Sequence, residues 1–368
     1  MPRRFSLYGV QHLSLRSWIL SIIVLSVITN EYLIYWLQSW RWPTLPVHER
    51  NPEREMVILL VSDPQIQGYQ DESPFPLGMF TRWDIDRFLS RTFSLAFDYS
   101  QPDAVVFLGD LMDEGSKATT EEYQYTLSRF HNIFYPVENS VVIFIPGDND
   151  IGGEGRDYRT PWKMSRYEES FGNISGLVNV GFVDFIKLDL QFHHEMPPYM
   201  LKLIAEVNQK SSAPIRIIIN HDMLLPKMKF FIHPILRLVR PHLLLTGHWH
   251  EAIHFDCVDC MAENTDSSHW PVHRKDLYMK HYIDLDLSDP LAIHELMVPS
   301  CSYRMGKKDM GYGVLVIKPD GKMKFTVLWL PHRYTMLFYY LYLSSVLAVI
   351  ATCVWVYKYL RTVRHLSR

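Results

Sequence analysis

The chain has 368 residues, of which 48% are hydrophobic, and this is enough apolar material to bury the core of one large domain. Its formal net charge is only -3, and no dense stripe of Lys and Arg occurs outside the two ends. This argues against nucleic acid as a partner, because nucleic acids bind to concentrated basic surfaces.

The first long apolar segment is Trp18–Leu37, which follows the basic residues Arg3, Arg4 and Arg16. At about 1.5 Å per helical residue, it is long enough to cross a hydrocarbon core of about 30 Å. A cleaved signal peptide is the alternative. We favour an uncleaved anchor, because the apolar residues continue to Trp40 and no small-residue cleavage site follows.

Five short apolar runs in the middle of the chain end at side chains that bind metals. The runs are Met56–Val61, Ala104–Leu108, Val141–Ile145, Ile215–Ile219 and Leu243–Leu245. Each run is rich in branched residues and short, which predicts a strand buried on both faces. Because ligands of open sheets bind beyond the carboxyl ends of parallel strands, side chains from all five ends can meet in one crevice.

The residues that follow these runs supply carboxylates and imidazoles. They are Asp63, Asp110, Asp148, His221, His248 and His250. Such oxygen and nitrogen donors hold Zn, Fe or Mn ions. A carboxylate can also bridge two ions about 3.5–4 Å apart, the arrangement that hydrolyses phosphate esters. The pattern therefore predicts a binuclear metal enzyme.

Segments with a helical period lie between the metal-bearing strands. Trp83–Tyr99 places its apolar residues largely on one stripe, and Thr120–Phe134 begins with Thr and an acidic first turn. We interpret these two as crossover helices. Weaker helical patterns cover Pro161–Phe171, Pro197–Asn208 and Phe230–Val239.

The character of the chain changes after His250. Glu251–Lys280 is polar with little periodicity, and we expect a long loop near the site. Its Cys257 and Cys260 are either a loop disulfide or free thiols. Short strands are then predicted at Tyr282–Leu287, Ile293–Val298, Val314–Ile317 and Lys324–Leu330. We expect them to complete a second sheet packed on the first, in an α/β (α+β) sandwich of two mixed β-sheets flanked by helices.

A second apolar segment, Tyr334–Tyr357, carries no charge and predicts a second membrane span. Basic residues follow it: Lys358, Arg361, Arg364 and Arg368. Because basic residues lie outside both spans, both termini are expected in the cytosol. The predicted order is a cytosolic tail (1–16), a transmembrane helix (17–38), a lumenal domain (39–333), a transmembrane helix (334–357) and a basic cytosolic tail (358–368). Asn173 begins an Asn-Ile-Ser glycosylation acceptor, consistent with a lumenal domain.

The strand-end motifs, taken in order, resemble the signature of the calcineurin-like metallophosphoesterase superfamily. That signature runs D-x-H, G-D-x-x-D, G-N-H-[DE], a lone His, and G-H-x-H. The chain has Asp63-Pro64-Gln65, Gly109-Asp110-Leu111-Met112-Asp113, Gly147-Asp148-Asn149-Asp150, His221 and Gly247-His248-Trp249-His250. The resemblance implies one ion held by Asp63, Gln65, Asp110 and His250. It implies a second ion held by Asp110, Asp148, His221 and His248, with Asp110 as the bridge.

The chain departs from this signature at three positions. Gln65 replaces a His and can ligate only through a neutral carbonyl oxygen, whereas Asp148 replaces an Asn and adds a carboxylate. The centre is thus richer in hard oxygen donors, which favours Mn over Zn. Asn149 replaces the motif His and cannot be a general acid, so we expect it to hydrogen-bond beside the ligands.

For the reaction, we expect two ions to activate a bridging hydroxide and to stabilise the leaving alkoxide. The proton would come from His221, Asp150, water or the substrate. Arg304 follows a predicted strand and either holds a phosphate oxygen or pairs with a loop carboxylate. Asp113 and Asp222 are expected to support the site rather than to bind metal.

Segments outside the signature resemble the metallophosphoesterase 1 family, among them Glu31–Trp36, Val298–Arg304 and Leu330–Arg333. The resemblance implies a two-span membrane enzyme of the early secretory pathway. Its implied reaction is Mn-dependent removal of the ethanolamine-phosphate side branch from the second mannose of GPI anchors. Cargo-sorting receptors can then capture GPI-anchored proteins for export from the endoplasmic reticulum.

The compartments implied are the endoplasmic reticulum, its exit sites, the ER-Golgi intermediate compartment and the cis-Golgi. Two alternatives remain open. One is a metallophosphoesterase that acts on another lumenal or lipid phosphate ester. The other is a catalytically weak, metal-binding scaffold in trafficking.

Overall fold

The structure, a computed structural model, describes residues 15–45, 53–135, 137, 140–190, 196–227, 232–262, 270–277 and 282–366. These residues form two units. The central unit is Arg41–Leu330, and the terminal unit combines the residues up to Trp40 with those from Pro331 onward.

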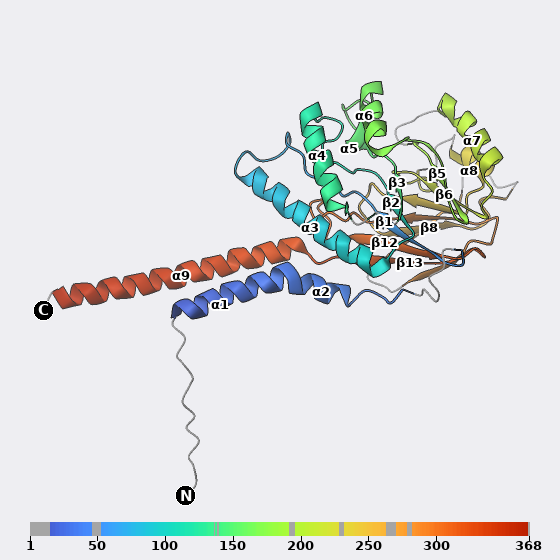
Figure 1. Ribbon diagram of the computed structural model, residues 1–368. Coiled ribbons are helices and arrows are strands. Elements are labelled where there is room, and N and C mark those ends of the chain that lie inside the picture. The colour runs from blue at the N-terminus through green and yellow to red at the C-terminus, as the bar shows by residue number, and fades with distance from the viewer. Residues whose placement is uncertain are drawn as a thin grey trace, which may run out of the picture. The chain divides into compact units, whose positions relative to one another are not determined.

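Two mixed sheets make up the central unit (Figure 1). The first has the order β10-β13-β12-β1-β2-β3. Its strands are β1 (Met56–Val61), β2 (Ala104–Phe107), β3 (Val141–Phe144), β10 (Ile283–Asp286), β12 (Gly311–Ile317) and β13 (Lys322–Trp329). Strands β1, β2 and β3 are parallel, whereas β12 pairs antiparallel with β1.

The second sheet has the order β4-β5-β6-β7-β11-β8-β9. Its strands are β4 (Gly176–Val180), β5 (Val183–Lys187), β6 (Ile215–Ile219), β7 (Leu243–Thr246), β8 (Ile253–Cys257), β9 (His273–Asp276) and β11 (Ile293–Met297). Strands β5, β6, β7 and β11 are parallel in this order. All five predicted metal-bearing strands are therefore present, but they are divided between two sheets.

The core lies between the inner faces of the two sheets. Alternate residues of each strand point into it, among them Leu60, Val106, Ile217 and Leu245, all of which are fully buried. The intervening residues face the helices, because successive side chains of a strand point to opposite faces. Burying both faces explains why these strands are apolar without interruption.

Helices cover the outer faces of the sheets (Figure 1). They are α3 (Leu77–Ser100), α4 (Thr120–Ile133), α5 (Asp148–Ile151), α6 (Pro161–Phe171), α7 (Pro198–Lys210) and α8 (Ile232–Val239). On the first sheet, Phe93 of α3 and Phe130 of α4 pack against Phe107 of β2. On the second sheet, α7 and α8 bury an apolar face with Met200 and Leu236. Helix α4 starts with a capping box between Thr119 and Glu122, which satisfies its first amide groups.

The prediction of a long loop at Glu251–Lys280 is wrong, because β8 and β9 lie within it. Part of this segment, residues 263–269 and 278–280, lies outside the described residues. Strand β8 buries Ile253, His254 and Phe255 alike, and the polar His254 and Asp256 interrupt its apolar residues. All residues of β9 are exposed, so this edge strand has no apolar period at all.

The expected assignment of the later strands to a second sheet is also wrong. Strands β10, β12 and β13 extend the first sheet, and only β11 joins the second, where it lies parallel to β7. The hairpin of β12 and β13 gives β1 its second neighbour, Met56 pairing with Ile317. Such pairing links residues far apart in the chain, so a local sequence pattern cannot predict it. The hairpin of β4 and β5 was not predicted.

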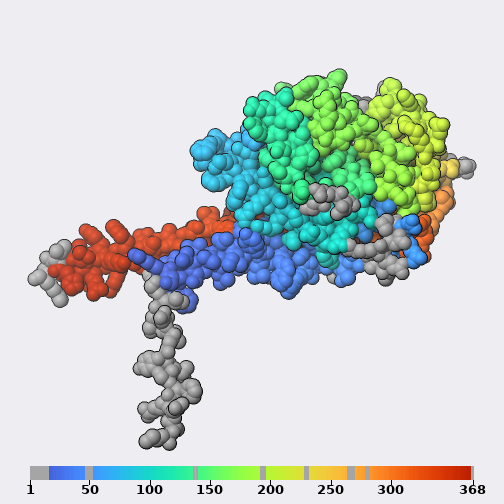
Figure 2. Space-filling model, viewed as in Figure 1, coloured from blue at the N-terminus to red at the C-terminus, as the bar shows by residue number. Residues whose placement is uncertain are grey.

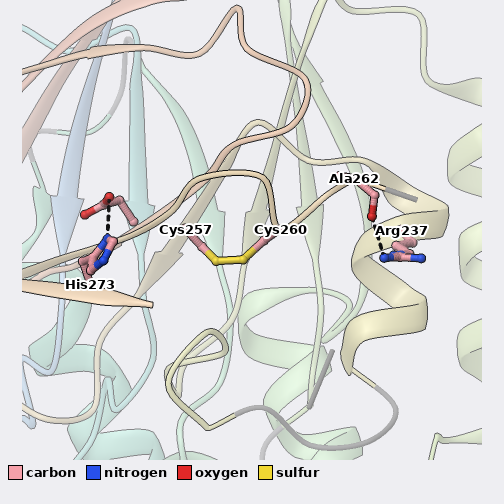
Figure 3. The surroundings of a disulfide bond; sticks show 6 residues. Arg237, Cys257, Cys260, Ala262 and His273 are labelled. Carbon is pink, nitrogen blue, oxygen red and sulfur yellow. Dashed lines mark hydrogen bonds and ion pairs between the residues drawn. A yellow bond between two sulfur atoms is a disulfide. The ribbon is translucent and has the colours of Figure 1, made fainter. Parts of the chain in front are cut away.

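Cys257 and Cys260 form a disulfide across the turn that follows β8 (Figure 3). The same turn region is joined to α8, because Arg237 donates from its Nη2 to the carbonyl of Ala262 across 2.8 Å. Of the two alternatives for these cysteines, the structure thus shows the loop disulfide.

The terminal unit contains two long apolar helical segments. The first is continuous through α1 (Leu15–Ile28), a π-helical turn η1 (Thr29–Leu33) and α2 (Ile34–Ser39), and the second is α9 (Arg333–Leu366). Segments Arg16–Ser39 and Arg333–His365 each contain an 18-residue stretch of high mean hydropathy, 1.7 in the first and 1.9 in the second, and both segments are long enough to cross a membrane. Their orientation, and the predicted boundaries of tails and spans, stay predictions.

The π-helical turn brings two consecutive polar residues, Asn30 and Glu31, into buried positions. Within this unit, Asn30 donates from its Nδ2 to the carbonyl of Met336 across 3.2 Å. Glu31 accepts from Arg333 at 3.0 Å and from the hydroxyl of Tyr340 at 3.1 Å. Polar groups within apolar helices are stable only when paired, and these contacts pair the two helices.

Candidate metal centre

The carboxyl ends of β2, β3, β6 and β7 converge on one group of side chains. Asp110, Asp148, His221 and His248 each offer one donor atom, and these atoms all lie within 4.8 Å of one another. The first two residues follow strands of the first sheet, and the other two follow strands of the second. The site therefore lies where the strand ends of both sheets meet.

Unusual backbone conformations aim these side chains at one another. Eight described residues other than glycine have positive φ angles, and five of them are predicted ligands: Asp63 (47°), Gln65 (41°), Asp110 (50°), His248 (69°) and His250 (58°). Residues other than glycine rarely adopt positive φ angles, and doing so costs about 1–3 kcal/mol per residue. The concentration of such residues at one place indicates a site where geometry is preserved at the expense of stability.

Two glycines of the motifs allow the loops to approach closely. A Cβ atom on Gly109, which has a φ of +94°, would overlap the ring of His221. A Cβ atom on Gly147 would overlap the carboxylate of Asp110. The loops that carry the ligands can touch only because no side chain stands between them.

Asp110 lies at the centre of the hydrogen-bond network. Its Oδ1 accepts from the backbone N–H of Asn149 at 2.9 Å, and its Oδ2 accepts from Nδ2 of the same residue at 3.0 Å. Nε2 of Gln65 donates to Oδ2 at 2.9 Å. The amide nitrogen of Gln65 thus faces Asp110, so ligation through its Oε1 requires the amide to turn over.

His221 is fully buried and its orientation is set by the first sheet. Its Nδ1 lies 2.6 Å from the carbonyl oxygen of Leu108, so Nδ1 carries the proton and donates it. Its Nε2 then faces the carboxylates, 3.6 Å from Oδ1 of Asp110 and 3.4 Å from Oδ1 of Asp148. A histidine that binds a metal through Nε2 usually donates its Nδ1 proton to a carbonyl or carboxylate in this way.

His248 completes the same side of the cluster. Its Nδ1 lies 3.1 Å from Oδ1 of Asp148 and 3.2 Å from Nε2 of His221. Burial opposes ionisation of Asp148, but the imidazoles of His221 and His248 outweigh it and hold its pKa below the usual range. Asp148 is therefore an anion, as a ligand must be.

Asp63 and His250 form the other side. Oδ1 of Asp63 lies 3.5 Å from Nε2 of His250, while Oδ2 accepts from the backbone N–H of His248 at 3.1 Å and from the hydroxyl of Ser62. Burial raises the pKa of Asp63, but its contacts with His250 and His221 outweigh this and lower it overall. Nε2 of Gln65 lies 3.5 Å from Nε2 of His250, so Gln65 belongs to the same group of side chains.

The donor set fits divalent cations. Among the described residues, Oδ1 of Asp63 and Oδ1 of Asp148 are buried and accept no well-aligned hydrogen bond, although imidazole nitrogens lie 3.5 Å and 3.1 Å from them. Buried carboxylate oxygens without partners are costly, unless a cation satisfies them. Three carboxylates and three imidazoles in one place form a donor set for two divalent ions, and they do not specify which metal. The metal, including Mn, stays a prediction.

Asn149 and Asp150 support the centre from the third motif. Both oxygens of Asp150 are used by backbone amides, those of Leu111 (3.1 Å), Met112 (3.0 Å) and Gly147 (2.8 Å). Burial, together with the charge of Asp110, raises the pKa of Asp150 to about 7. Asp150 therefore joins the second motif to the third, and Asn149 orients the carboxylate of Asp110.

Arg304 pairs with a loop carboxylate, the second of its two predicted roles. Its Nη2 lies 2.8 Å from Oε1 of Glu72. Arg304 also acts on Asp113 through its charge. Burial and the charge of Glu114 raise the pKa of Asp113 to about 6, and the positive charge of Arg304 opposes this shift. A contact between Arg304 and a phosphate stays a proposal.

Some supporting residues were missed by the sequence reasoning. The carboxylate of Glu114 accepts from the backbone amides of Tyr69, Gln70 and Asp71, each at 2.7 Å. It thereby fastens the loop after β1 to the second motif. The only signal in the sequence was its position next to Asp113, and residues more than forty positions away cannot be paired from a local pattern.

Asp222 fixes the tryptophan between the last two ligands. Its Oδ1 lies 3.2 Å from Nε1 of Trp249 and 2.9 Å from Nζ of Lys227. Asp222 thus positions Trp249 between the two predicted histidine ligands. Glu154, which was not predicted, lies close enough for the charge of Asp148 to raise its pKa. Asn173 is exposed after α6, and its use as a glycosylation site stays a prediction.

Two mixed sheets with carboxylates and imidazoles at their shared strand ends form a metallophosphoesterase fold. Residues 56–252 match the calcineurin-like phosphoesterase family, and because this is more than half of the 368 residues, the chain belongs to that family.

Curated relatives resemble part of the chain. Cell division control protein 1 of Saccharomyces cerevisiae is 28% identical over 179 residues, 47% of this chain and 35% of the relative. Metallophosphoesterase 1 of Danio rerio is 27% identical over 194 residues, 50% of this chain and 47% of the relative. The Metallophosphoesterase 1 homolog of Drosophila melanogaster is 25% identical over 171 residues, 46% of this chain and 44% of the relative.

The matched part thus spans less than half the length of each of these relatives. Among solved structures, a purple acid phosphatase from yellow lupin seeds is similar with a TM-score of 0.49 and 11% identity. That match covers 74% of this chain and 52% of the lupin chain.

Proposed function

We propose that this chain is a membrane-anchored, binuclear-metal phosphodiesterase that removes the side-branch ethanolamine phosphate from the second mannose of GPI anchors. The observation that carries the catalytic part is the convergence of Asp110, Asp148, His221 and His248 at the strand ends of two sheets. The substrate is proposed from the resemblance to the metallophosphoesterase 1 family, and relatives of that name support it.

Six side chains and the amide of Gln65 divide between two metal positions. We assign Asp63, Gln65 and His250 to one position and Asp148, His221 and His248 to the other, with Asp110 shared by both. Two divalent ions at these positions would supply a nucleophilic hydroxide and Lewis acidity toward the phosphate. We propose Mn for both, because the set is rich in hard oxygen donors.

The contacts of three side chains bear on which group donates the proton that the leaving group needs. Nδ1–H of His221 is committed to Leu108, and its Nε2 faces the carboxylates. Both oxygens of Asp150 are occupied by backbone amides. Asn149 has no acidic proton and holds Asp110. We therefore propose water or the substrate, of the four predicted sources, as the donor of this proton.

For the location, we propose that Arg16–Ser39 and Arg333–His365 span a membrane of the early secretory pathway, with the central unit in the lumen. The length and hydropathy of both segments support this. A GPI-anchored protein would be the substrate, and a cargo-sorting receptor would capture the trimmed product. The basic ends of the chain favour cytosolic termini.

The test is to delete the protein from cells and to examine GPI glycans by mass spectrometry. We expect glycans that retain the side-branch ethanolamine phosphate, and we expect re-expression of the wild type to remove it. Asp110→Asn should not restore trimming. Unchanged glycans after deletion would refute the substrate, and rescue by Asp110→Asn would support a scaffold instead of an enzyme.

A second measurement separates catalysis from substrate choice. The purified full-length chain, supplied with Mn, should hydrolyse a small chromogenic phosphodiester. Turnover of this compound with unchanged cellular glycans would favour another lumenal or lipid phosphate ester. Absence of both bound metal and turnover would favour the scaffold.

A further inference from the structure

An apolar patch lies exposed at the start of α3. It consists of Phe75, Leu77, Met79, Phe80 and Trp83, whose exposed fractions are 82%, 56%, 46%, 56% and 56%. We call these residues the α3 patch. They belong to a lobe that protrudes from the central unit, coloured in the lighter blues in Figure 2. Among the described residues of this unit, no other segment of similar length exposes so many large apolar side chains.

The patch is not a badly packed part of the core. The opposite face of the same helix buries Ile85, Phe88 and Leu89 almost completely. The first turn is held in place, since Arg82 donates to the carbonyl of Gly68 at 3.3 Å and Thr81 to that of Gly78 at 3.0 Å. Helix α3 therefore has an apolar inner face along its length and a second apolar face at its start.

The segment that carries the patch is fastened to the metal centre. It is the connection between β1, which precedes Asp63, and α3. Glu114 holds three backbone amides of this connection, and Glu72 within it pairs with Arg304. Tyr303 also donates to Asp84 of α3 at 2.9 Å. Whatever the patch binds is thereby held at a defined position relative to the metal ligands.

The chemistry of the patch suits the interfacial region of a bilayer. Large apolar patches on a soluble surface mark interaction sites, and Trp and Phe beside cationic groups prefer the boundary between lipid headgroups and chains. Here the guanidinium of Arg87 lies 5.0 Å from the ring centroid of Trp83, and that of Arg82 lies 4.3 Å from the ring of Tyr69. Two cationic groups thus lie beside aromatic rings at this end of the helix.

The chain itself keeps the central unit close to lipid. This unit begins at Arg41, two residues after α2 ends at Ser39, and it ends at Leu330, three residues before α9 begins at Arg333. If both helices span a bilayer, connections this short limit how far the unit can lie from the membrane surface.

We propose that the α3 patch is a lipid-docking surface that inserts into the headgroup region of the bilayer on the side of the central unit. This rests on the proposed membrane anchorage. It deepens the proposed function, because docking would hold the metal centre at a fixed height for a phosphodiester that is itself anchored in lipid.

The direct test measures depth in the full-length chain, reconstituted in phosphatidylcholine vesicles. A Cys353→Ala background removes the exposed thiol, since Cys301 is buried and Cys257 and Cys260 form a disulfide. A fluorophore is attached at Phe75→Cys or, as a control, at Leu201→Cys on α7, which is 59% exposed. Brominated lipids should quench position 75 by about twofold and leave position 201 unchanged. Equal quenching at both positions would overturn the proposal. This is also the result expected if the patch binds a protein instead of lipid.

A second test uses turnover. The variant Phe75→Ser, Leu77→Ser, Phe80→Ser is compared with a matched control, Tyr125→Ser, Leu201→Ser, Leu238→Ser, whose residues are exposed on other helices. The patch variant should lose about tenfold in activity on a GPI-anchored protein in the same vesicles, because orientation is lost. Hydrolysis of a water-soluble phosphodiester should stay within about twofold for both variants.

The outcomes separate docking from the proposed function. An equal loss on both substrates would assign the patch to folding and overturn the proposal, as would no loss on either. A wild-type chain that hydrolyses the soluble diester but not the GPI-anchored protein would refute the substrate alone. The depth measurement then decides whether the patch docks to lipid.

Discussion

His221 donates from its Nδ1 to the carbonyl oxygen of Leu108 across 2.6 Å, and this bond joins the two sheets at the metal centre. Leu108 follows β2 of the first sheet, directly before Gly109 and Asp110. His221 follows β6 of the second sheet. One hydrogen bond thus sets the tautomer of a ligand and the distance between the two strand ends that it faces.

The central position of Asp110 predicts the largest loss on substitution. Asp110→Asn removes a negative charge between the two metal positions, so we expect activity to fall by at least about 100-fold. Bound metal should also decrease, measured by elemental analysis of the purified protein. Asp71→Asn serves as a control, because Asp71 is exposed and only its backbone contacts the site. Full metal content and activity in Asp110→Asn would contradict the assignment of the bridge.

Asn149 stands where the family motif has a His, and its contacts predict the effect of restoring that His. Both oxygens of Asp110 are bound by Asn149, one of them through the side-chain amide. An imidazole cannot reproduce that short contact, so Asn149→His should lower kcat about tenfold. The pH dependence of kcat is the informative measurement. A gain in kcat would show that the chain only lacks the usual acid.

A substitution at Gly147 is expected to act sterically rather than through charge. An added Cβ would overlap the carboxylate of Asp110 and its backbone nitrogen, which cannot move freely. We expect Gly147→Ala to destabilise the fold by about 1–3 kcal/mol and to reduce bound metal. Gly155→Ala is the control, because a Cβ there meets nothing within 4 Å although its φ is +57°. The control should lose some stability, seen in thermal unfolding, but no metal.

The pair of His254 and His294 predicts a pH dependence of stability. Nε2 of His254 lies 3.2 Å from Nδ1 of His294, and burial with the charge of His294 lowers the pKa of His254 to about 4. The unfolded chain, with an ordinary pKa near 6.5, binds more protons between these values. Stability should therefore be complete above about pH 6.5 and should decrease as the pH falls toward 4, by about 2–3 kcal/mol.

Thermal unfolding of the full-length chain at pH 5 and pH 7.5 measures this effect. His254→Leu should unfold with a smaller difference between the two pH values than the wild type. His273→Leu is the control, because His273 is exposed on the edge strand β9. An unchanged pH dependence in His254→Leu would contradict the role of burial at this position.

Much of the fold could be predicted because strong patterns are local. The boundaries of β1, β6 and α6 agree with their predicted ranges, and α4 and α7 lie where the period placed them, whereas α3 starts at Leu77, six residues before its predicted start at Trp83. Their residues face buried surroundings on one or both sides, so the apolar pattern records them. Strand β9 could not be found in this way, because it is an exposed edge strand and buries nothing.

The candidate site likewise has a part that local sequence patterns predict and a part that they do not. The ligands were predicted because each directly follows a buried strand, and their order carries the family signature. The partners of the supporting residues were not predicted. Glu114 binds amides 43–45 positions away, and Arg304 pairs with Glu72 across 232 positions. Such contacts depend on how loops pack, and single residues in loops leave no periodic trace.

By itself, the sequence determined the strand ends, the ligand types and the two apolar helices, because each depends on a residue and its near neighbours. Only the tertiary structure decided that the predicted ligands come from two sheets and that Asp150 accepts hydrogen bonds from three backbone amides. It also decided that the apolar start of α3 stays exposed. Pairing between distant strands and the burial of a given face are properties of the whole fold, so no local segment specifies them.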